Sequence, residues 1–234
     1  MLALSDYSYA YPTGAFRLRI DTLSLARGEV VFLNGRSGCG KTTVLNLLSG
    51  VIPSDIVGRS RTEFGLIGYV MHESTLLPWL SVEQNLITEA RLRRVDYDVR
   101  KFIAIAERLE LDAGCVSLRP RELSHGMRQR IEIAKALSFH VGLLLLDEGL
   151  SGIDTATRRQ AIRELWRVVC DAGLTIVATA HHPIDVISFA QRVYRVSNGV
   201  IGTEVKFRDT VDERLEMPLD KLYRLEEAAG LLSE

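Results

Sequence analysis

Apolar and polar residues alternate along this chain with two different periods, which divide it into β-rich and helical regions. Phe16, Leu18 and Ile20 alternate with polar residues, as the two faces of a half-exposed strand do. Residues 141–146 are instead a continuous apolar run, which is typical of a strand buried on both faces of a parallel sheet, and residues 174–180 are expected to form another buried strand. We therefore expect an α/β fold with an N-terminal antiparallel β layer beside a mixed, mainly parallel sheet.

The remaining predicted strands flank turn and loop signals. Ser197-Asn198-Gly199 separates two alternating segments and is a hairpin signal. Residues 49–65 are rich in Gly, Pro, Ser and Arg, so we expect a loop with weak structure there. Further strands are expected at residues 29–33, 66–71, 192–196 and 200–205.

Helical spacing dominates the middle of the chain. Ser81 and Gln84 have the capping-box spacing, which predicts a helix that starts near Ser81 and ends at about Arg94. Apolar residues recur at helical spacing in two later segments, which predicts helices near residues 99–109 and after residue 124. We therefore expect residues 74–138 to form a helical sub-domain inserted between two β-rich parts.

Two more helices are expected towards the C-terminus. Asp154 or Thr155 can cap the first of them, and Gly173 ends it. The second is expected at residues 219–232. The chain is thus predicted to be one domain, residues 1–234, with a core of residues 1–73 and 139–205, the helical sub-domain, and a helical tail of residues 206–234.

The bulk composition is that of an ordinary globular protein. The 234 residues are 47% apolar and 25% charged, and the formal net charge of −1 favours neither a nucleic-acid partner nor an anionic membrane surface. No apolar run approaches the roughly 18–20 residues that span a bilayer, and the N-terminus is unlike an export signal. The cysteines Cys39, Cys115 and Cys170 lack metal-ligand spacing, which favours reduced thiols in a cytosolic protein, with Cys39 accessible to alkylation.

A glycine-rich segment between a predicted strand and a predicted helix has the pattern of a phosphate-binding loop. Glycines allow the backbone N–H groups to approach phosphate oxygens, Lys41 supplies a positive charge, and Thr42 supplies a hydroxyl to Mg²⁺. The helix that follows points its positive N-terminal end at the phosphates. We therefore expect a nucleoside triphosphate at Gly35, Arg36, Ser37, Gly38, Cys39, Gly40, Lys41, Thr42 and Thr43.

Two acids and a histidine follow later predicted strands. Asp147 and Glu148 end the apolar run of residues 141–146, at the edge where such sheets bind ligands. Phosphoryl transfer needs charge neutralisation and a group that orients water, and paired acids there meet both needs. His181 ends the next apolar run.

These motifs, in this order, resemble those of the nucleotide-binding subunit of ATP-binding-cassette (ABC) ATPases, over about residues 7–205. The resemblance implies ATP and Mg²⁺ as cofactors. It implies that Asp147 holds Mg²⁺ through water, that Glu148 is the general base, and that His181 is the switch histidine that contacts the γ-phosphate. The spacing to Ala190-Gln191-Arg192-Val193 favours His181 over His182.

The resemblance extends to residues outside the phosphate loop. Tyr11 is similar to the aromatic residue that stacks on adenine, with Tyr9 as the competing candidate, and the segment up to Asp154 resembles the D-loop that links two sites in a dimer. Leu123-Ser124-His125-Gly126-Met127 resembles the signature motif L-S-G-G-Q, in which the helix start binds the γ-phosphate of the other protomer. Ser124, His125 and Gly126 are therefore expected to bind ATP across a dimer.

The chain departs from the family at four places. His125 stands where glycine is usual, and Gly149 replaces the usual proline, which should loosen that turn. His72 occupies the position of the Q-loop glutamine, which touches Mg²⁺ and the attacking water, so the resemblance gives His72 a catalytic and metal-binding role with slower or pH-sensitive turnover. The stretch from Lys41 to His72 is also shorter than usual, so we expect its β arm to be trimmed.

The resemblance implies partners. A separate ATPase chain acts through an integral membrane permease, on the cytoplasmic face of the membrane, with a second copy of itself or a paralogue. Residues 76–86 and Met127-Arg128-Gln129-Arg130 are similar to importers of the nitrate, sulfonate, taurine and thiamine group, which implies an external solute-binding protein. In the family the helical sub-domain holds a groove for the permease's coupling helix, and Trp79 and Leu80 are candidates to line it or to lie in the sub-domain core.

Three functions remain open at this point. The leading hypothesis is a transport ATPase for small-molecule import. Phe32-Leu33-Asn34-Gly35 and Ile176-Val177-Ala178-Thr179 are similar to chains of lipoprotein-export or cell-division complexes, which favours a mechanical ATPase that imports no solute. A nucleic-acid or ribosome ATPase is the third hypothesis, but the chain shows no second cassette, long coil or basic stretch, so we expect no nucleic-acid partner.

Overall fold

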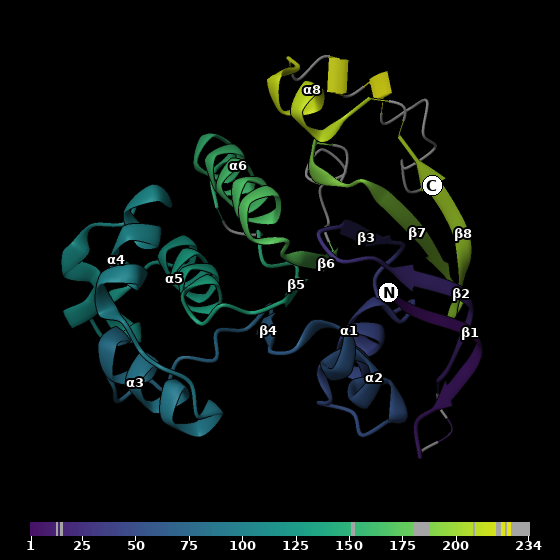
Figure 1. Cartoon of the computed structure of the whole chain (residues 1–234), viewed down its shortest axis with the longest axis horizontal. Helices are drawn as coiled ribbons and strands as arrows, with labels where there is room; N and C mark the ends of the chain where they lie inside the picture. The colour runs from purple at the N-terminus through teal and green to yellow at the C-terminus, as the bar shows by residue number, and fades with distance from the viewer. Residues whose placement is uncertain are drawn as a thin grey trace.

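Eight strands form one mixed sheet in the order β1-β2-β8-β7-β3-β6-β5-β4 in the computed structural model of the chain (Figure 1). The structure describes residues 1–12, 14, 16–150, 153–179, 188–207, 209–218, 221–222 and 224–225. The strands are β1 (Leu2–Ala10), β2 (Arg17–Leu25), β3 (Val30–Asn34), β4 (Ile67–Val70), β5 (Leu143–Asp147), β6 (Thr175–Thr179), β7 (Arg192–Ser197) and β8 (Val200–Lys206).

The antiparallel part of the sheet comes from β1 with β2 and from β7 with β8. Leu18 and Ile20 are buried while their neighbours in β2 are exposed or half-buried, as the alternation predicts. Asn198 and Gly199 both have positive φ, 48° and 75°, which suits a tight hairpin between β7 and β8. The predicted N-terminal antiparallel layer is confirmed, and a parallel pairing of β2 with β8 makes it continuous with the rest of the sheet.

The parallel part of the sheet runs from β7 through β3, β6 and β5 to β4. Val31 and Leu33 pack into one hydrophobic cluster, whereas Val30 and Phe32 pack into a second cluster. The side chains of β5 divide in the same way. Each continuous apolar run is therefore buried on both faces, as predicted, and the carboxyl ends of these strands meet at one edge of the sheet.

One cluster is covered by α1 (Lys41–Ser49) and α2 (Asp55–Phe64), which lie together beside the sheet (Figure 1). The expectation of a loop at residues 49–65 was wrong, because most of this segment is α2. Ile56, Ser60 and Phe64 recur every four residues and are buried, so packing holds a helix that its composition disfavours. No strand lies between α1 and β4, in agreement with a trimmed β arm.

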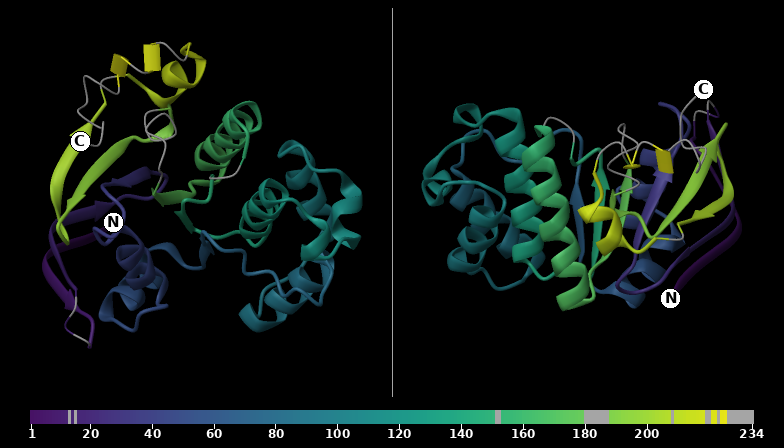
Figure 2. Two further views of the ribbon diagram at one scale, coloured as in Figure 1. Left: turned by 180° about the vertical axis from the view of Figure 1, so that it is seen from behind. Right: turned by 90° about the horizontal axis from the view of Figure 1, so that it is seen from above.

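The other cluster extends into a group of helices on the opposite side of the molecule from β1 (Figures 1 and 2). The predicted capping box is present, since the Ser81 hydroxyl accepts from Gln84 N at 3.2 Å. All three predicted helices are confirmed. The elements are α3 (Val82–Arg93), α4 (Val99–Arg108), η1 (Ala113–Ser117), η2 (Pro120–Glu122) and α5 (His125–Ser138).

Helices α6 (Thr155–Ala172) and α8 (Val211–Glu216) come later in the described part of the chain. Helix α6 is capped by Asp154, whose Oδ1 accepts from Thr157 N at 3.1 Å, and it ends at Gly173 with φ 65°. Helix α8 starts at Thr210 with a capping box and lies within residues 206–234, where a helical tail but no separate helix at these residues was expected. The predicted helix at residues 219–232 lies largely outside the described residues, and the sub-domain boundaries stay predictions.

Among the residues that the structure describes, no helix combines the length and the apolarity needed to cross a membrane.

Candidate nucleotide-binding and hydrolysis site

The glycines of the phosphate loop are required by the backbone geometry between β3 and α1. Gly38 and Gly40 have φ of 75° and 112°, a region that glycine adopts without strain. Gly35 has no room for a side chain, because a Cβ there would lie 2.1 Å from the carbonyl oxygen of Val196 in β7. The loop is therefore held in a tight turn that presents its backbone to the start of α1.

Lys41 is the first residue of α1, and its ammonium group folds back over the loop. Its Nζ donates to the carbonyl oxygens of Gly35 at 2.6 Å and Arg36 at 3.0 Å, and the residue is buried. Thr42, next to it, is exposed. The loop thus combines a fixed positive charge, a hydroxyl and the N-terminal end of a helix, a combination that suits a phosphate group.

A pocket of about 310 Å³ lies over this loop. Tyr11 lines it, and its hydroxyl lies 3.3 Å from the Thr43 hydroxyl, whereas Tyr9 packs edge-on against Tyr11 with ring centroids 5.1 Å apart and does not line the pocket. The geometry thus favours Tyr11 over Tyr9 as the base-stacking candidate. The lining residues are Tyr11, Phe16, Ser37, Gly38, Gly40, Lys41, Thr42, Thr43 and Glu148.

Phe16 is a lining residue that the sequence analysis treated only as part of a strand. A Cβ on Gly40 would lie 2.8 Å from the Phe16 ring, so the ring rests directly on the loop. Arg36, Ser37 and Cys39 line a smaller hollow beside it, of about 230 Å³. Cys39 is buried, so the expectation that its thiol is accessible was wrong: the Sγ packs under the loop beside Gly35.

Asp147 and Glu148 stand at the carboxyl end of β5, as predicted, and β6 lies between β5 and β3. Thr179, the last residue of β6, connects them: its hydroxyl donates to Asp147 Oδ1 at 2.8 Å and accepts from Glu148 N at 3.0 Å. Asp147 is buried, while Glu148 has φ 54° and reaches the pocket over the loop. No sequence motif indicates this role of Thr179.

His72 comes after β4 and meets Glu148, with Nδ1 3.2 Å from Oε2. The carbonyl oxygen of His72 accepts from Gln129 Nε2 in α5 at 3.3 Å. The structure therefore brings together His72 and Glu148, two residues that lie far apart in the sequence. The predicted contact of His72 with Mg²⁺ stays a prediction.

The signature-like residues are not part of the pocket over the phosphate loop. Ser124 caps α5, where its hydroxyl accepts from Met127 N at 3.2 Å, and His125 and Gly126 form the first turn. His125 and His72 line a separate pocket of about 490 Å³ between the segment after β4 and α5. Asp154 caps α6 and also lies outside the phosphate-loop pocket. His181, His182, Ser151 and Gly152 lie outside the described residues.

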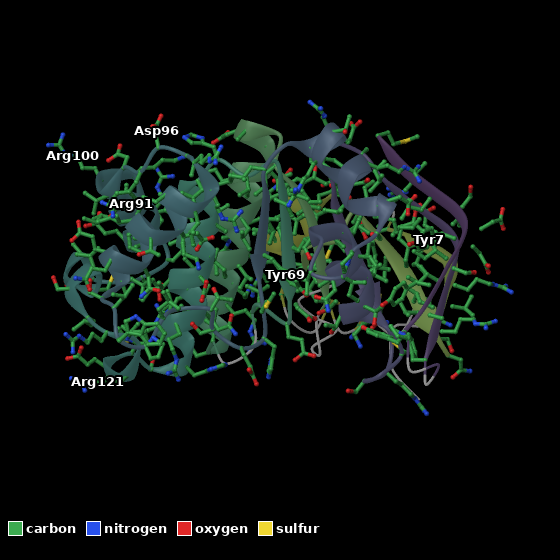
Figure 3. All side chains as sticks on the ribbon, turned by 90° about the horizontal axis from the view of Figure 1, so that it is seen from below. Tyr7, Tyr69, Arg91, Asp96, Arg100 and Arg121 are labelled. Carbon is green, nitrogen blue, oxygen red and sulfur yellow. The ribbon has the colours of Figure 1, made fainter. Side chains whose placement is uncertain are left out.

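Tyr69 lies close to this site from β4. Its hydroxyl donates to Asn46 Oδ1 at 2.9 Å, and Figure 3 shows it near the middle of the molecule, between Tyr7 and the helical part that carries Arg91, Arg100 and Arg121. Burial, and to a lesser extent the charge of Asp147, raise the pKa of the Tyr69 phenol well above its ordinary value. Tyr69 is therefore a neutral donor that holds α1 against the sheet.

A strand, a phosphate loop and a helix, with paired acids two strands away, define a P-loop nucleoside triphosphatase. The ABC transporter family model matches residues 18–151, which is more than half of the chain. The chain therefore belongs to the ABC transporter family.

Individual relatives agree with the family match. The nitrate import ATP-binding protein of Synechococcus elongatus is 36% identical over 192 residues, which covers 76% of this chain but 28% of the relative. The bicarbonate transport ATP-binding protein of a Synechocystis strain is likewise covered over 28% of its length, so the chain spans little more than a quarter of these two proteins. An aliphatic sulfonates import ATP-binding protein of Shouchella clausii is 31% identical, covering 86% of this chain and 79% of the relative.

Solved structures support the fold. An ATP-binding cassette in a dimeric post-hydrolysis state, bound to ADP and Pi, superposes with a TM-score of 0.75 at 24% identity, covering 90% of this chain and 100% of that chain. The predicted P-loop core with a mixed sheet is thereby confirmed.

Proposed function

We propose that this chain is the ATP-hydrolysing subunit that powers an ABC importer of a small molecule. The observation that carries the proposal is that Glu148, from the end of β5, shares one pocket with Lys41 and Thr42 of the phosphate loop. A carboxylate beside a phosphate site is suited to orient the water that attacks the γ-phosphate. The import function rests on the names of the relatives.

The residues at the site fit a magnesium–nucleotide complex. Bound Mg²⁺ neutralises phosphate charge, and it prefers oxygen ligands. Thr42 offers an exposed hydroxyl, and Asp147 offers a carboxylate whose orientation is fixed by Thr179. We assign these two residues to the metal, the loop backbone and Lys41 to the phosphates, and Tyr11 to the base. His181 is proposed as the γ-phosphate sensor from the sequence motif alone.

A second protomer is proposed to complete each site. Ser124, His125 and Gly126 do not line the pocket of their own chain, yet they begin a helix of 14 residues whose N-terminus favours anions. These residues are proposed to bind the γ-phosphate held by another cassette, with Asp154 at the same interface. ATP then contacts both protomers only in the closed dimer, so its binding shifts the population towards closure.

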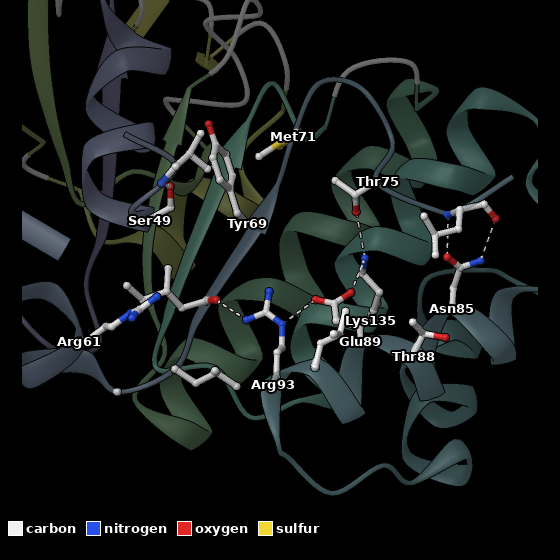
Figure 4. Close-up of a pocket in the computed structure, with 16 residues that line it drawn as sticks. Ser49, Arg61, Tyr69, Met71, Thr75, Asn85, Thr88, Glu89, Arg93 and Lys135 are labelled. Carbon is white, nitrogen blue, oxygen red and sulfur yellow. Dashed lines mark hydrogen bonds and ion pairs between the residues drawn. The ribbon is translucent and has the colours of Figure 1, made fainter. Parts of the chain in front are cut away.

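A cavity of about 980 Å³ between the sheet and the helical part is proposed to receive a helix of the permease (Figure 4). Ser49, Arg61 and Tyr69 line it from the core, and Thr88 and Glu89 line it from α3. Its rim includes two strongly exposed apolar residues, Val51 and Leu92. Exposed apolar side chains beside a cavity are typical of a protein interface.

Trp79 and Leu80 are near this cavity in sequence but do not line it. Trp79 is 65% exposed, which excludes the interpretation that it belongs to the sub-domain core. We keep Trp79 as a candidate contact for the permease at the edge of the interface. With such a partner the chain would be peripheral, on the cytoplasmic face of the cell membrane.

The substrate class is proposed from the relatives. Those named here are import or transport proteins for nitrate, bicarbonate and aliphatic sulfonates, all small oxyanions. We propose that the importer carries a small oxyanion, delivered by an external solute-binding protein. Selection of the solute then lies in the partner proteins.

The experiment is affinity purification of tagged Glu148→Gln chain from detergent-solubilised membranes with ATP and Mg²⁺, followed by mass spectrometry. The expected result is the capture of a permease with many membrane spans, in stoichiometric amount and together with a closed dimer of the tagged chain. The Lys41→Ala chain, treated identically, should not form the closed dimer. A partner with few spans and a large external domain would contradict import and favour the mechanical ATPase. Capture of no membrane partner would overturn transport altogether.

A further inference from the structure

We propose that His72 is a positioning residue for Glu148, which holds the carboxylate of the general base through its Nδ1–H. The inference rests on the proposed role of Glu148 in ATP hydrolysis. It assigns to His72 a contact with a carboxylate, made by the ring nitrogen nearest the backbone, in place of the glutamine-like contact with metal and water that the family position implies.

The contact is an ion-pair contact in which His72 Nδ1 lies 3.2 Å from Glu148 Oε2. In the proposed arrangement Nδ1–H donates to this oxygen, because an ionised carboxylate only accepts hydrogen bonds. A hydrogen bond to an ionised group is stronger than one between neutral groups. Glutamate has three rotatable side-chain bonds, and a donor on one carboxylate oxygen restricts how the other oxygen points.

Helix α5 fixes the segment that carries His72. The buried Gln129 donates to the His72 carbonyl at 3.3 Å. The buried Glu132, one turn further along, accepts from Ser74 Oγ at 2.9 Å and from Thr75 N at 2.7 Å. The imidazole therefore stands on a backbone that α5 holds at residue 72 and again at residues 74 and 75, which is what a positioning role requires.

The backbone of Glu148 is fixed independently from the sheet. Its N–H donates to Thr179 Oγ1 at 3.0 Å, and its φ of 54° turns the side chain out of the strand direction. Both ends of the contact are thus held by elements that do not depend on it. The side chain of Glu148 is the part left to be oriented, and its solvent exposure is 19% against 59% for His72.

The atom in contact allows a sharp test with two amide variants. The side-chain amide nitrogen of asparagine stands one bond from Cγ, as Nδ1 does, whereas that of glutamine reaches one carbon further, towards the position of Nε2. His72→Asn should therefore preserve the donor to Glu148, and His72→Gln should not. His72→Ala removes every donor and sets the baseline.

The readouts are steady-state ATP hydrolysis by the full chain, ATP affinity, and the thermal midpoint of unfolding. We expect kcat to fall roughly 10- to 100-fold in His72→Ala and His72→Gln, the range for losing a hydrogen bond to a charged group, with KM nearly unchanged. His72→Asn should retain kcat within about threefold of the wild-type value. In a Glu148→Gln background, His72→Ala should change residual turnover little, because residues that act as one unit are not additive.

The outcomes separate this inference from the proposed function. Wild-type turnover in Glu148→Gln would overturn the role of Glu148 itself, and with it the basis of the inference. Loss of turnover in Glu148→Gln together with normal turnover in His72→Ala would overturn the positioning role alone. Full activity in His72→Gln with loss of activity in His72→Asn would also overturn the positioning role, because a donor at the position of Nε2, and not of Nδ1, would then be required.

Discussion

Replacing Lys135 by methionine tests the ion network on which the cavity floor is built (Figure 4). The Lys135 ammonium is buried and lies 2.7 Å from both Glu132 Oε2 and Glu89 Oε2, and it donates to Thr75 Oγ1 at 3.1 Å. Glu132 is 2% exposed, so removal of the cation leaves a buried carboxylate beside a second one. Methionine keeps most of the volume of the lysine side chain, so the loss of stability measures the missing charge rather than the creation of a cavity.

The magnitude follows from what remains around the two carboxylates. Breaking a buried ion pair on one side costs about 3–5 kcal/mol. Glu132 keeps donors from Ser74 and Thr75, and Glu89 keeps Arg93 Nε at 2.7 Å, so the lower end of that range applies. We expect a loss of about 3 kcal/mol in the free energy of unfolding, or a midpoint lowered by roughly 6–12 °C for a chain of this size.

Urea unfolding followed by circular dichroism measures this loss, with the exposed Lys221→Met as the matched control. The double variant Glu132→Gln/Lys135→Met should be more stable than the single one, because it leaves no buried charge unpaired there. A loss below about 1 kcal/mol in Lys135→Met, or a double variant less stable than the single, would refute the reasoning.

The same network predicts a pH dependence. Burial alone would lower the pKa of Lys135, but the charges of Glu132 and Glu89 outweigh it and raise the pKa, so this stabilisation is lost only as pH rises through that raised value. Burial alone would raise the pKa of Glu89, but Lys135 and Arg93 outweigh it and lower the pKa, so that contribution is lost as pH falls through the lowered value. The difference between wild type and Lys135→Met should therefore be constant near neutrality and shrink at both extremes.

Three further predictions concern other parts of the chain. Lys41→Ala should abolish ATP binding, measured with a fluorescent nucleotide; retained affinity would contradict the phosphate-loop assignment. Gly58→Ala should stabilise the chain by about 0.5–1 kcal/mol, because Gly58 lies within α2 and nothing lies within 4 Å of a Cβ there, whereas destabilisation in urea would argue against the helix. Ellman's reagent should modify the exposed Cys170 of the native chain while Cys39 and Cys115 react only after denaturation; rapid labelling of all three would rule out their burial.

The strands and the longer helices were predictable because an alternation, a continuous apolar run or a helical spacing marks each of them. Helix α2 was not, since one of the three residues on its buried face is Ser60, which leaves only Ile56 and Phe64 as an apolar signal. That serine is fully buried by tertiary packing, and packing is not visible in a local window.

The candidate site likewise contains local motifs, which are visible in the sequence, and tertiary contacts, which are not. The loop, the acids and the signature-like segment are local motifs, and the sequence located them. The contacts of Thr179 with Asp147, of His72 with Glu148 and of Phe16 with the loop depend on which strands lie side by side. The sequence shows that Thr179 ends a buried strand, but only the order of the sheet places that strand between β3 and β5.

The two bonds from Lys41 to the carbonyl groups of its own loop give this side chain a second task. The ammonium cross-links the turn, so the loop reaches its shape when the domain folds and phosphate meets a preformed cradle. Little chain entropy is then lost when phosphate binds. The rate of phosphate binding should be limited by diffusion and by the step in which the Lys41 ammonium exchanges its carbonyl partners for phosphate oxygens. Lys41 thus stabilises the folded loop before it supplies a positive charge to a ligand.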